Sequence, residues 1–134
     1  NNSTGTVSGT KYISSLSPYG IEFSPGSTKF YVGHNTGMPI QQFDLLAGND
    51  SLILASTTTV SPANPALSLQ LAVNGKIYFD DMMLNSLGSI NNPDSPGLTC
   101  NVSYNQVPYT GTGGSLPNNF NFPQKLTLSH CDII

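Results

Sequence analysis

The stretch YGIEFSPGSTKFYV, residues 19–32, alternates apolar and polar residues on both sides of the turn sequence Ser24-Pro25-Gly26-Ser27. Alternation is typical of a strand with one buried face, and the Pro-Gly pair is typical of a turn. A second stretch, LQLAVNGKIYF at residues 69–79, repeats this pattern around Asn74-Gly75. Asn-Gly favours a tight hairpin because both residues accept positive φ angles. The sequence therefore predicts two similar antiparallel hairpins.

Both hairpins belong to a longer internal repeat with an offset of 47 residues. The matched pairs are Lys29 with Lys76, Phe30 with Ile77, Tyr31 with Tyr78, Val32 with Phe79, Ile40 with Leu87, Phe43 with Ile90, Asp44 with Asn91 and Ile53 with Cys100. Upstream, Ile21 and Phe23 match Leu69 and Leu71 once the first hairpin turn is allowed one extra residue. A register kept over this length predicts a duplicated structural unit.

Each unit is predicted to contain four short strands. They are expected at residues 19–24, 28–34, 39–45 and 51–59 in the first unit, and at 67–72, 76–80, 87–91 and 99–104 in the second. No stretch shows a convincing helical period, since residues 43–54 are interrupted by Gly48-Asn49-Asp50. Four strands in a repeat of this length match a propeller blade. We therefore expect an all-β chain of two tandem four-stranded, propeller-blade-like antiparallel units, with a β-sandwich as the alternative.

The predicted division of the chain adds a flank on each side of the two units. It comprises an N-terminal flanking strand at residues 1–18, the first β-unit at 19–60, the second at 61–107, and a C-terminal loop and strand at 108–134. In the flanks, residues 4–13 are rich in β-branched residues and residues 124–130 alternate, so both are predicted to form strands. They are either edge strands of the same domain or strands that pair with a neighbour.

The composition excludes several classes of partner. The 134 residues suffice for one domain, and they include four lysines, no arginine and seven acidic residues, a net charge of −3. This balance provides no basic surface for nucleic acid, and no apolar run is long enough to insert into a membrane. The chain begins NNSTGT, without methionine or a signal peptide, so we expect a processed or truncated product.

Five quoted stretches carry a resemblance to a known family: YGIEFSPGSTKFYV, IQQFDLLAGND, LQLAVNGKIYF, LGSINNPDSPGLTCNVSY and GGSLPNNF. In this order and spacing they resemble the closing blades of the β-propeller region in secreted, gliding-motility-associated surface proteins of the Bacteroidota. They are more distantly similar to YVTN/WD40-like propeller repeats. The likeness covers residues 19–122 and implies an extracellular or cell-surface protein. One departure is the first hairpin, which in the family usually reads Ser-Pro-Asp-Gly.

Two blades cannot close a propeller ring, which typically needs four or more. They are expected to leave an apolar face and unpaired strand edges, which recruit other chains. We therefore expect an exported, non-enzymatic module that acts in cell-surface structure, adhesion or filament assembly. Its partner is expected to be itself or a neighbouring β-domain, joined through the edges at residues 4–13 and 124–130. The alternative is a fragment of a larger ligand-binding or lactonase-like enzymatic propeller.

Candidates for catalysis are few. The two histidines are His34 and His130, and no common metal-binding or nucleophile motif occurs. His130 is adjacent to Cys131, but neighbouring side chains on a strand point to opposite faces. Asp80, Asp81 and Asp94 lack the spacing of a calcium loop. The chain is therefore expected to have no catalytic residues, no metal and no cofactor.

The two cysteines, Cys100 and Cys131, are candidates for a disulfide because the composition suggests an oxidising extracellular setting. Spacing alone does not show that their Cβ atoms meet. Two buried free thiols remain the alternative.

Glycosylation is expected to help keep a surface with few charges soluble. The resemblance implies that Ser51, in Asp50-Ser51-Leu52, is an O-glycosylation candidate, because Bacteroidota modify Asp-Ser/Thr-apolar sequences of exported proteins. Asn2, Asn49 and Asn101 match the N-glycosylation pattern. Such triplets also arise by chance in a chain rich in Asn and Ser.

Overall fold

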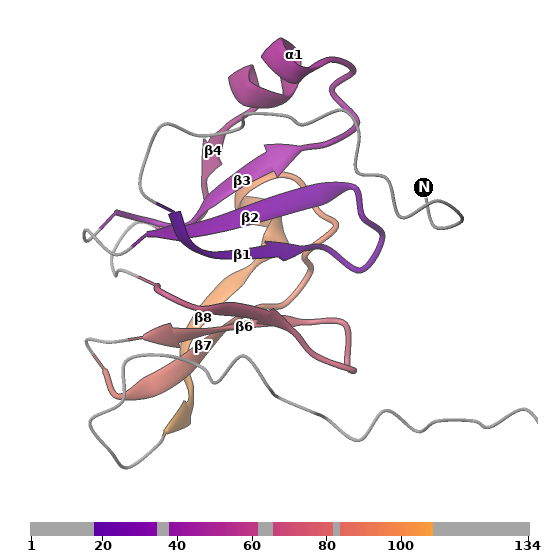
Figure 1. Ribbon diagram of the computed structural model, residues 1–134. Coiled ribbons are helices and arrows are strands. Elements are labelled where there is room, and N and C mark those ends of the chain that lie inside the picture. The colour runs from indigo at the N-terminus through magenta and orange to yellow at the C-terminus, as the bar shows by residue number, and fades with distance from the viewer. Residues whose placement is uncertain (1–17, 35–37, 62–65, 82–83, 109–134) are drawn as a thin grey trace, which may run out of the picture.

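The computed structural model describes residues 18–34, 38–61, 66–81 and 84–108 (Figure 1). It contains two four-stranded antiparallel sheets, in which neighbouring strands follow one another in the chain. The first sheet consists of β1 (Pro18–Phe23), β2 (Lys29–His34), β3 (Gln41–Asp44) and β4 (Thr58–Thr59). The second consists of β5 (Leu69–Leu71), β6 (Ile77–Asp81), β7 (Ser86–Ile90) and β8 (Val102–Pro108). The expected all-β fold with two four-stranded antiparallel units is confirmed.

One predicted strand is wrong. Residues 51–59 were expected to be extended, but the chain forms α1 (Asp50–Ala55) before the short strand β4. The helix begins at Asn49, whose side-chain Oδ1 accepts a hydrogen bond from the backbone N–H of Leu52 at 3.0 Å. Asp50 adds a negative charge in the first turn, which the helix dipole favours. Ile53 is the buried residue of the helix.

The last predicted strand also begins later than expected. Residues 97–100 form the 3-10 helix η1 (Gly97–Cys100), and β8 starts only at Val102. Asn101 ends η1 in the left-handed conformation, with φ of 58°. Asparagine tolerates this conformation better than most residues. The expected strand at 99–104 is therefore correct only from residue 102 onward.

The two hairpin turns differ in detail. In the first, Ser24 Oγ accepts hydrogen bonds from the backbone N–H groups of Thr28 and Lys29, so the serine side chain closes a longer turn. In the second, Gly75 has φ of 78° but Asn74 does not have a positive φ, and the Ala72 N–H bonds to the Lys76 carbonyl. The turn therefore spans residues 73–75, and the positive φ expected of both Asn74 and Gly75 is found only at Gly75. This difference accounts for the extra residue in the first turn.

The sequence repeat is also a structural repeat. One core cluster of the first sheet consists of Phe30, Val32, Phe43 and Ile53. The larger cluster contains their four counterparts 47 residues later, Ile77, Phe79, Ile90 and Cys100. We call the side of each sheet that carries these residues its apolar face, and the opposite side its receiving face. Equivalent residues thus form equivalent clusters on the same face of both sheets.

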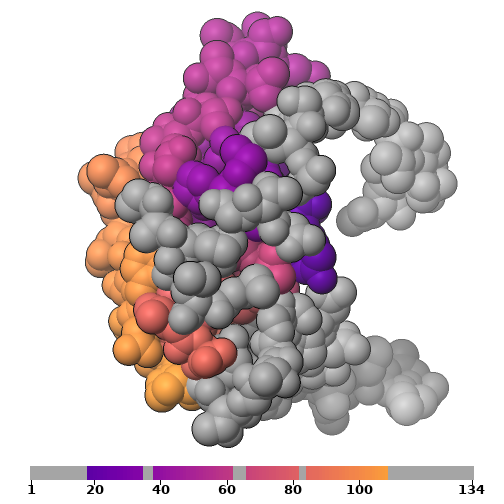
Figure 2. Space-filling model, turned by 90° about the vertical axis from the view of Figure 1, so that its left-hand side faces the viewer, coloured from indigo at the N-terminus to yellow at the C-terminus, as the bar shows by residue number. Residues whose placement is uncertain are grey.

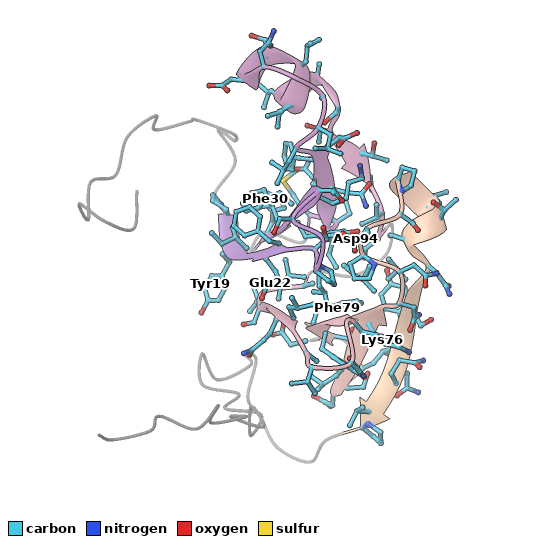
Figure 3. The ribbon with its side chains drawn as sticks, turned by 90° about the vertical axis from the view of Figure 1, so that its right-hand side faces the viewer. Tyr19, Glu22, Phe30, Lys76, Phe79 and Asp94 are labelled. Carbon is cyan, nitrogen blue, oxygen red and sulfur yellow. The ribbon has the colours of Figure 1, made fainter. Side chains whose placement is uncertain are left out.

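The two sheets pack through unlike faces. Besides the apolar face of the second sheet, the larger cluster contains Tyr31, Ile40 and Val60 from the receiving face of the first. In Figure 3, Phe30 lies on the side of the first sheet that faces away from the second sheet. Glu22 and Asp94 lie toward the boundary between the two sheets. Packing of one repeated sheet on the next is a property of repeat architectures, and the single contact seen between these two sheets is consistent with propeller-blade-like units.

Candidate interaction surface

The boundary between the sheets shows how one unit of this chain recognises another. At its centre, the buried Tyr31 hydroxyl donates a hydrogen bond to the Pro93 carbonyl at 2.7 Å. Gln42 Nε2 donates to Tyr31 Oη at 2.6 Å and to the Ser95 carbonyl at 2.9 Å. Gln42 Oε1 accepts from the backbone N–H of Gly97 at 2.7 Å. Burial raises the pKa of Tyr31, so its hydroxyl remains a donor.

At the first hairpin turn, a carboxylate forms hydrogen bonds across the same boundary. Asp94, in the loop before η1, accepts hydrogen bonds from the backbone N–H of Gly26 and from the Thr28 hydroxyl at 3.2 Å. A hydrogen bond from the Ser24 side chain is the largest of the influences that lower the pKa of Asp94. A carboxylate that accepts several hydrogen bonds favours its ionised form. Asp94 is thus engaged by the first hairpin turn.

Elsewhere at the boundary, strands β1 and β2 lie close to the backbone of residues 66–71. Glu22 Oε2 of β1 accepts a hydrogen bond from the backbone N–H of Leu71 in β5 at 2.8 Å. A Cβ atom placed on Gly33 would lie 2.3 Å from the Ala66 carbonyl oxygen, so the backbone of Ala66, shortly before β5, lies directly against β2. Asp80 Oδ1 accepts from the backbone N–H groups of Leu67 and Ser68. Desolvation raises the pKa of Asp80.

The opposite, apolar face of the first sheet has an exposed row. On β1, Tyr19 is 56% exposed, Ile21 58% and Phe23 49%. Leu69, the counterpart of Ile21 in the second unit, is 8% exposed, and Leu71, the counterpart of Phe23, packs against the larger cluster. The positions exposed in the first unit are therefore buried, at Leu69, or partly buried, at Leu71, in the second. Tyr19 lies at a shift in the register of β1, and in Figure 3 it is drawn at the level of Glu22 and away from Phe30.

Among the described strands, the edges of the two sheets are β1, β4, β5 and β8. In Figure 2, β1 reaches the surface on the right and β8 on the left, so these edges lie on opposite sides of the molecule. β8 is the longest described strand, and its last four residues, 105–108, are exposed. The flanking segments expected to pair with neighbours, residues 4–13 and 124–130, lie outside the described residues.

The candidate modification sites fall into two groups. Asn49, Ser51 and Asn101 are exposed, the first two at the start of α1 and the third at the end of η1. Ser51 lies in the first turn of α1, whereas the sequence predicted it at the start of a strand. Asn2 lies outside the described residues. Glycosylation at these positions remains a prediction.

The disulfide remains a prediction because Cys131 lies outside the described residues. Cys100 is fully buried in the larger cluster. Burial raises the pKa of its thiol. A raised pKa lowers the reactivity of a cysteine, because the thiolate is the nucleophile. This setting fits a structural cysteine.

Other polar groups are buried near the opposite ends of the strands. His34 Nε2 lies 3.2 Å from Gln41 Oε1, and its Nδ1 has no hydrogen-bond partner within the described residues. Asp80 Oδ2 and Ser86 Oγ are also buried without a hydrogen-bond partner within the described residues. Across residues 18–34, 38–61, 66–81 and 84–108, no group of three or more His, Cys, Asp or Glu residues is arranged to hold a metal ion. His130 lies outside these ranges.

Comparison of the chain with models of protein families, with characterised proteins and with solved structures gives no match. No helix in the described part of the chain is long and apolar enough to cross a membrane.

Proposed function

We propose that this chain is an exported, non-enzymatic β-repeat module that serves cell-surface structure, adhesion or filament assembly by joining another β-unit through its strand edges. The observation that carries the proposal is the exposed row Tyr19, Ile21 and Phe23 on the edge strand β1. Exposed apolar rows on an edge strand favour association, because both the unpaired backbone groups and the apolar surface are then covered.

The finer identity belongs to the same proposal. The resemblance to propeller blades of gliding-motility-associated surface proteins implies export to the cell surface, and the stacking of two repeated sheets supports the blade part of that resemblance. The exposure of Asn49, Ser51 and Asn101 leaves these positions accessible to glycosylation. Mass spectrometry of peptides from the native protein tests this point, and unmodified peptides at all three positions contradict it.

The assembly is tested with the 134-residue chain by sedimentation velocity over a range of concentrations. We expect the sedimentation coefficient to increase with concentration, and Ile21→Asp to abolish this increase. Val73→Asp is the matched control, because Val73 is also β-branched and is 72% exposed, but lies in the second hairpin turn. A chain that remains monomeric at all concentrations contradicts the proposal, as does equal loss of association in both variants.

A second candidate is a piece of a larger ligand-binding or lactonase-like enzymatic propeller. The packing of unlike faces favours it, because the same contact could continue through further blades. The two candidates differ in what the natural gene encodes next to residue 1. Several more units of this repeat favour the larger propeller, whereas a signal sequence directly before it favours a self-contained subunit.

A further inference from the structure

The receiving face of the second sheet carries the same apolar residues as the receiving face of the first. Tyr78, Leu87 and Val107 each lie 47 residues after a residue that the first sheet uses to receive the second, namely Tyr31, Ile40 and Val60. Leu87 pairs with Val107 across β7 and β8, just as the Val60 N–H bonds to the Ile40 carbonyl. The chain therefore contains this surface twice.

In the second sheet these three residues of the receiving face are partly accessible, whereas Asp80 and Ser89 on the same face are buried. Val107 is 46% exposed, and Tyr78 and Leu87 are half-buried, whereas Tyr31, Ile40 and Val60 are almost completely buried. At the other end of the molecule, the exposed Ile21 and Phe23 extend an apolar face whose counterpart in the second sheet is covered. The two ends thus carry the two halves of an interface that the chain already forms internally.

We propose that two copies of this chain dock head to tail, with the receiving face of the second sheet of one copy on the apolar face of the first sheet of the next. This inference rests on the proposed assembly function, but assigns the contact to sheet faces and the partner to a second copy. Because the two surfaces differ, the contact is heterologous. Repeated contacts of this type form either a ring or an open filament.

The contact between copies lacks a close approach and several polar contacts of the internal one, because the residues that make them differ. Asp80 stands where the first sheet has Gly33, so the close approach of the Ala66 backbone is not reproduced. Ser89 stands where the first sheet has Gln42, and Ala47 where the second unit has Asp94. The bonds made by Gln42 and Asp94 are therefore lost. We expect a reversible, concentration-dependent contact rather than a permanent one.

The test combines two variants of the full chain, each with one surface disabled. Ile21→Asp introduces a charge into the apolar face, and Val107→Asp introduces one into the receiving face. Both positions are largely exposed, so the fold is expected to persist, and circular dichroism checks this. Phe23→Asp and Leu87→Asp serve as second variants of the same two surfaces. Val73→Asp is the control, because Val73 lies outside both surfaces.

Each variant alone is expected to sediment as a monomer. An equimolar mixture of Ile21→Asp and Val107→Asp is expected to form a 1:1 dimer that does not grow further. The dimer forms because one variant retains the receiving face and the other retains the apolar face, while the two disabled surfaces repel each other. A wild-type chain that associates while Val107→Asp associates equally well overturns the head-to-tail contact and leaves the assembly function standing. An equimolar mixture of the two variants that remains monomeric also overturns the head-to-tail contact and leaves the assembly function standing. A monomeric wild-type chain overturns both proposals.

Discussion

The carboxylate of Asp94 accepts a hydrogen bond from the backbone N–H of Gly26, and the two residues lie 68 positions apart in the chain. Both carboxylate oxygens lie within bonding distance of that N–H, at 3.0 and 3.2 Å. The contact joins the loop before η1 to the first hairpin turn. It therefore links the two sheets at the first hairpin turn, whereas Ala66 contacts Gly33 near the other end of β2.

Replacement of Asp94 by alanine is expected to destabilise the chain by about 1 kcal/mol at neutral pH, because a charge-assisted hydrogen bond is lost at an exposed site where solvent weakens it. Asp94→Asn retains the acceptor oxygen and loses only the charge, so its effect is expected to be smaller. Chemical denaturation measures both.

The pH dependence follows from the lowered pKa of Asp94. The folded state favours the ionised carboxylate, so the stabilisation is complete above the pKa of the unfolded state, about 4. It disappears as the pH falls through the lower pKa of the folded state. Wild type and Asp94→Asn should therefore differ at pH 7 and converge at strongly acidic pH. A difference that is constant with pH contradicts this assignment.

Replacement of Gly33 by alanine is expected to destabilise the chain strongly, by about 2 to 4 kcal/mol, because the added Cβ would overlap the Ala66 carbonyl oxygen. The matched control is Gly75→Ala. Gly75 also has an unusual requirement, a positive φ of 78°, but nothing lies within 4 Å of an added Cβ. The control should lose only about 1 to 2 kcal/mol from backbone strain. Equal thermal stability of the two variants contradicts a close approach at Gly33.

The strands could be predicted because their signals are local. Alternation and the Asn74-Gly75 turn identified both hairpins, and the 47-residue offset identified the pairs that now occupy equivalent clusters, such as Phe30 with Ile77. The helix α1 was missed because six residues are too few to show a helical period. Its available signal was Asn49 followed by Asp50, a capping residue with an acid in the first turn.

The boundary between the sheets could not be predicted at the level of residues. Tyr31 and Pro93 are 62 positions apart, and Gln42 and Ser95 are 53 apart, so no local pattern relates them. The sequence indicated no role for Asp94, which lacks the spacing of a calcium loop, and no local signal indicated its hydrogen bond to the backbone of Gly26.

Asp80 should make the stability of this chain fall as the pH rises. Its pKa is raised by burial, and Oδ2 has no hydrogen-bond partner within the described residues. For an acid with a raised pKa, the folded state disfavours ionisation, so stability is lost between the pKa of the unfolded state, about 4, and the higher pKa of the folded state. Asp80→Asn can still accept hydrogen bonds from Leu67 and Ser68.

We therefore expect Asp80→Asn to gain stability relative to wild type as the pH rises from about 4 to 7. The measurement is the free energy of unfolding at a series of pH values. A relative stability that falls over this interval, or does not change, shows that ionisation of Asp80 carries no penalty in the folded chain.

The repeat provides a matched pair for the exposed row on β1. Leu69→Ala is expected to destabilise the chain by about 2 to 5 kcal/mol, because Leu69 is buried in the larger cluster. Ile21→Ala changes the corresponding position of the first unit, where the side chain is 58% exposed, and should cost less than about 1 kcal/mol in dilute solution. If copies dock through this face, the penalty for Ile21→Ala grows with protein concentration, because association stabilises the wild type only. Denaturation at two concentrations separates these effects. A large penalty for Ile21→Ala at high dilution shows that its side chain already packs within its own chain, which removes the basis for docking on that row.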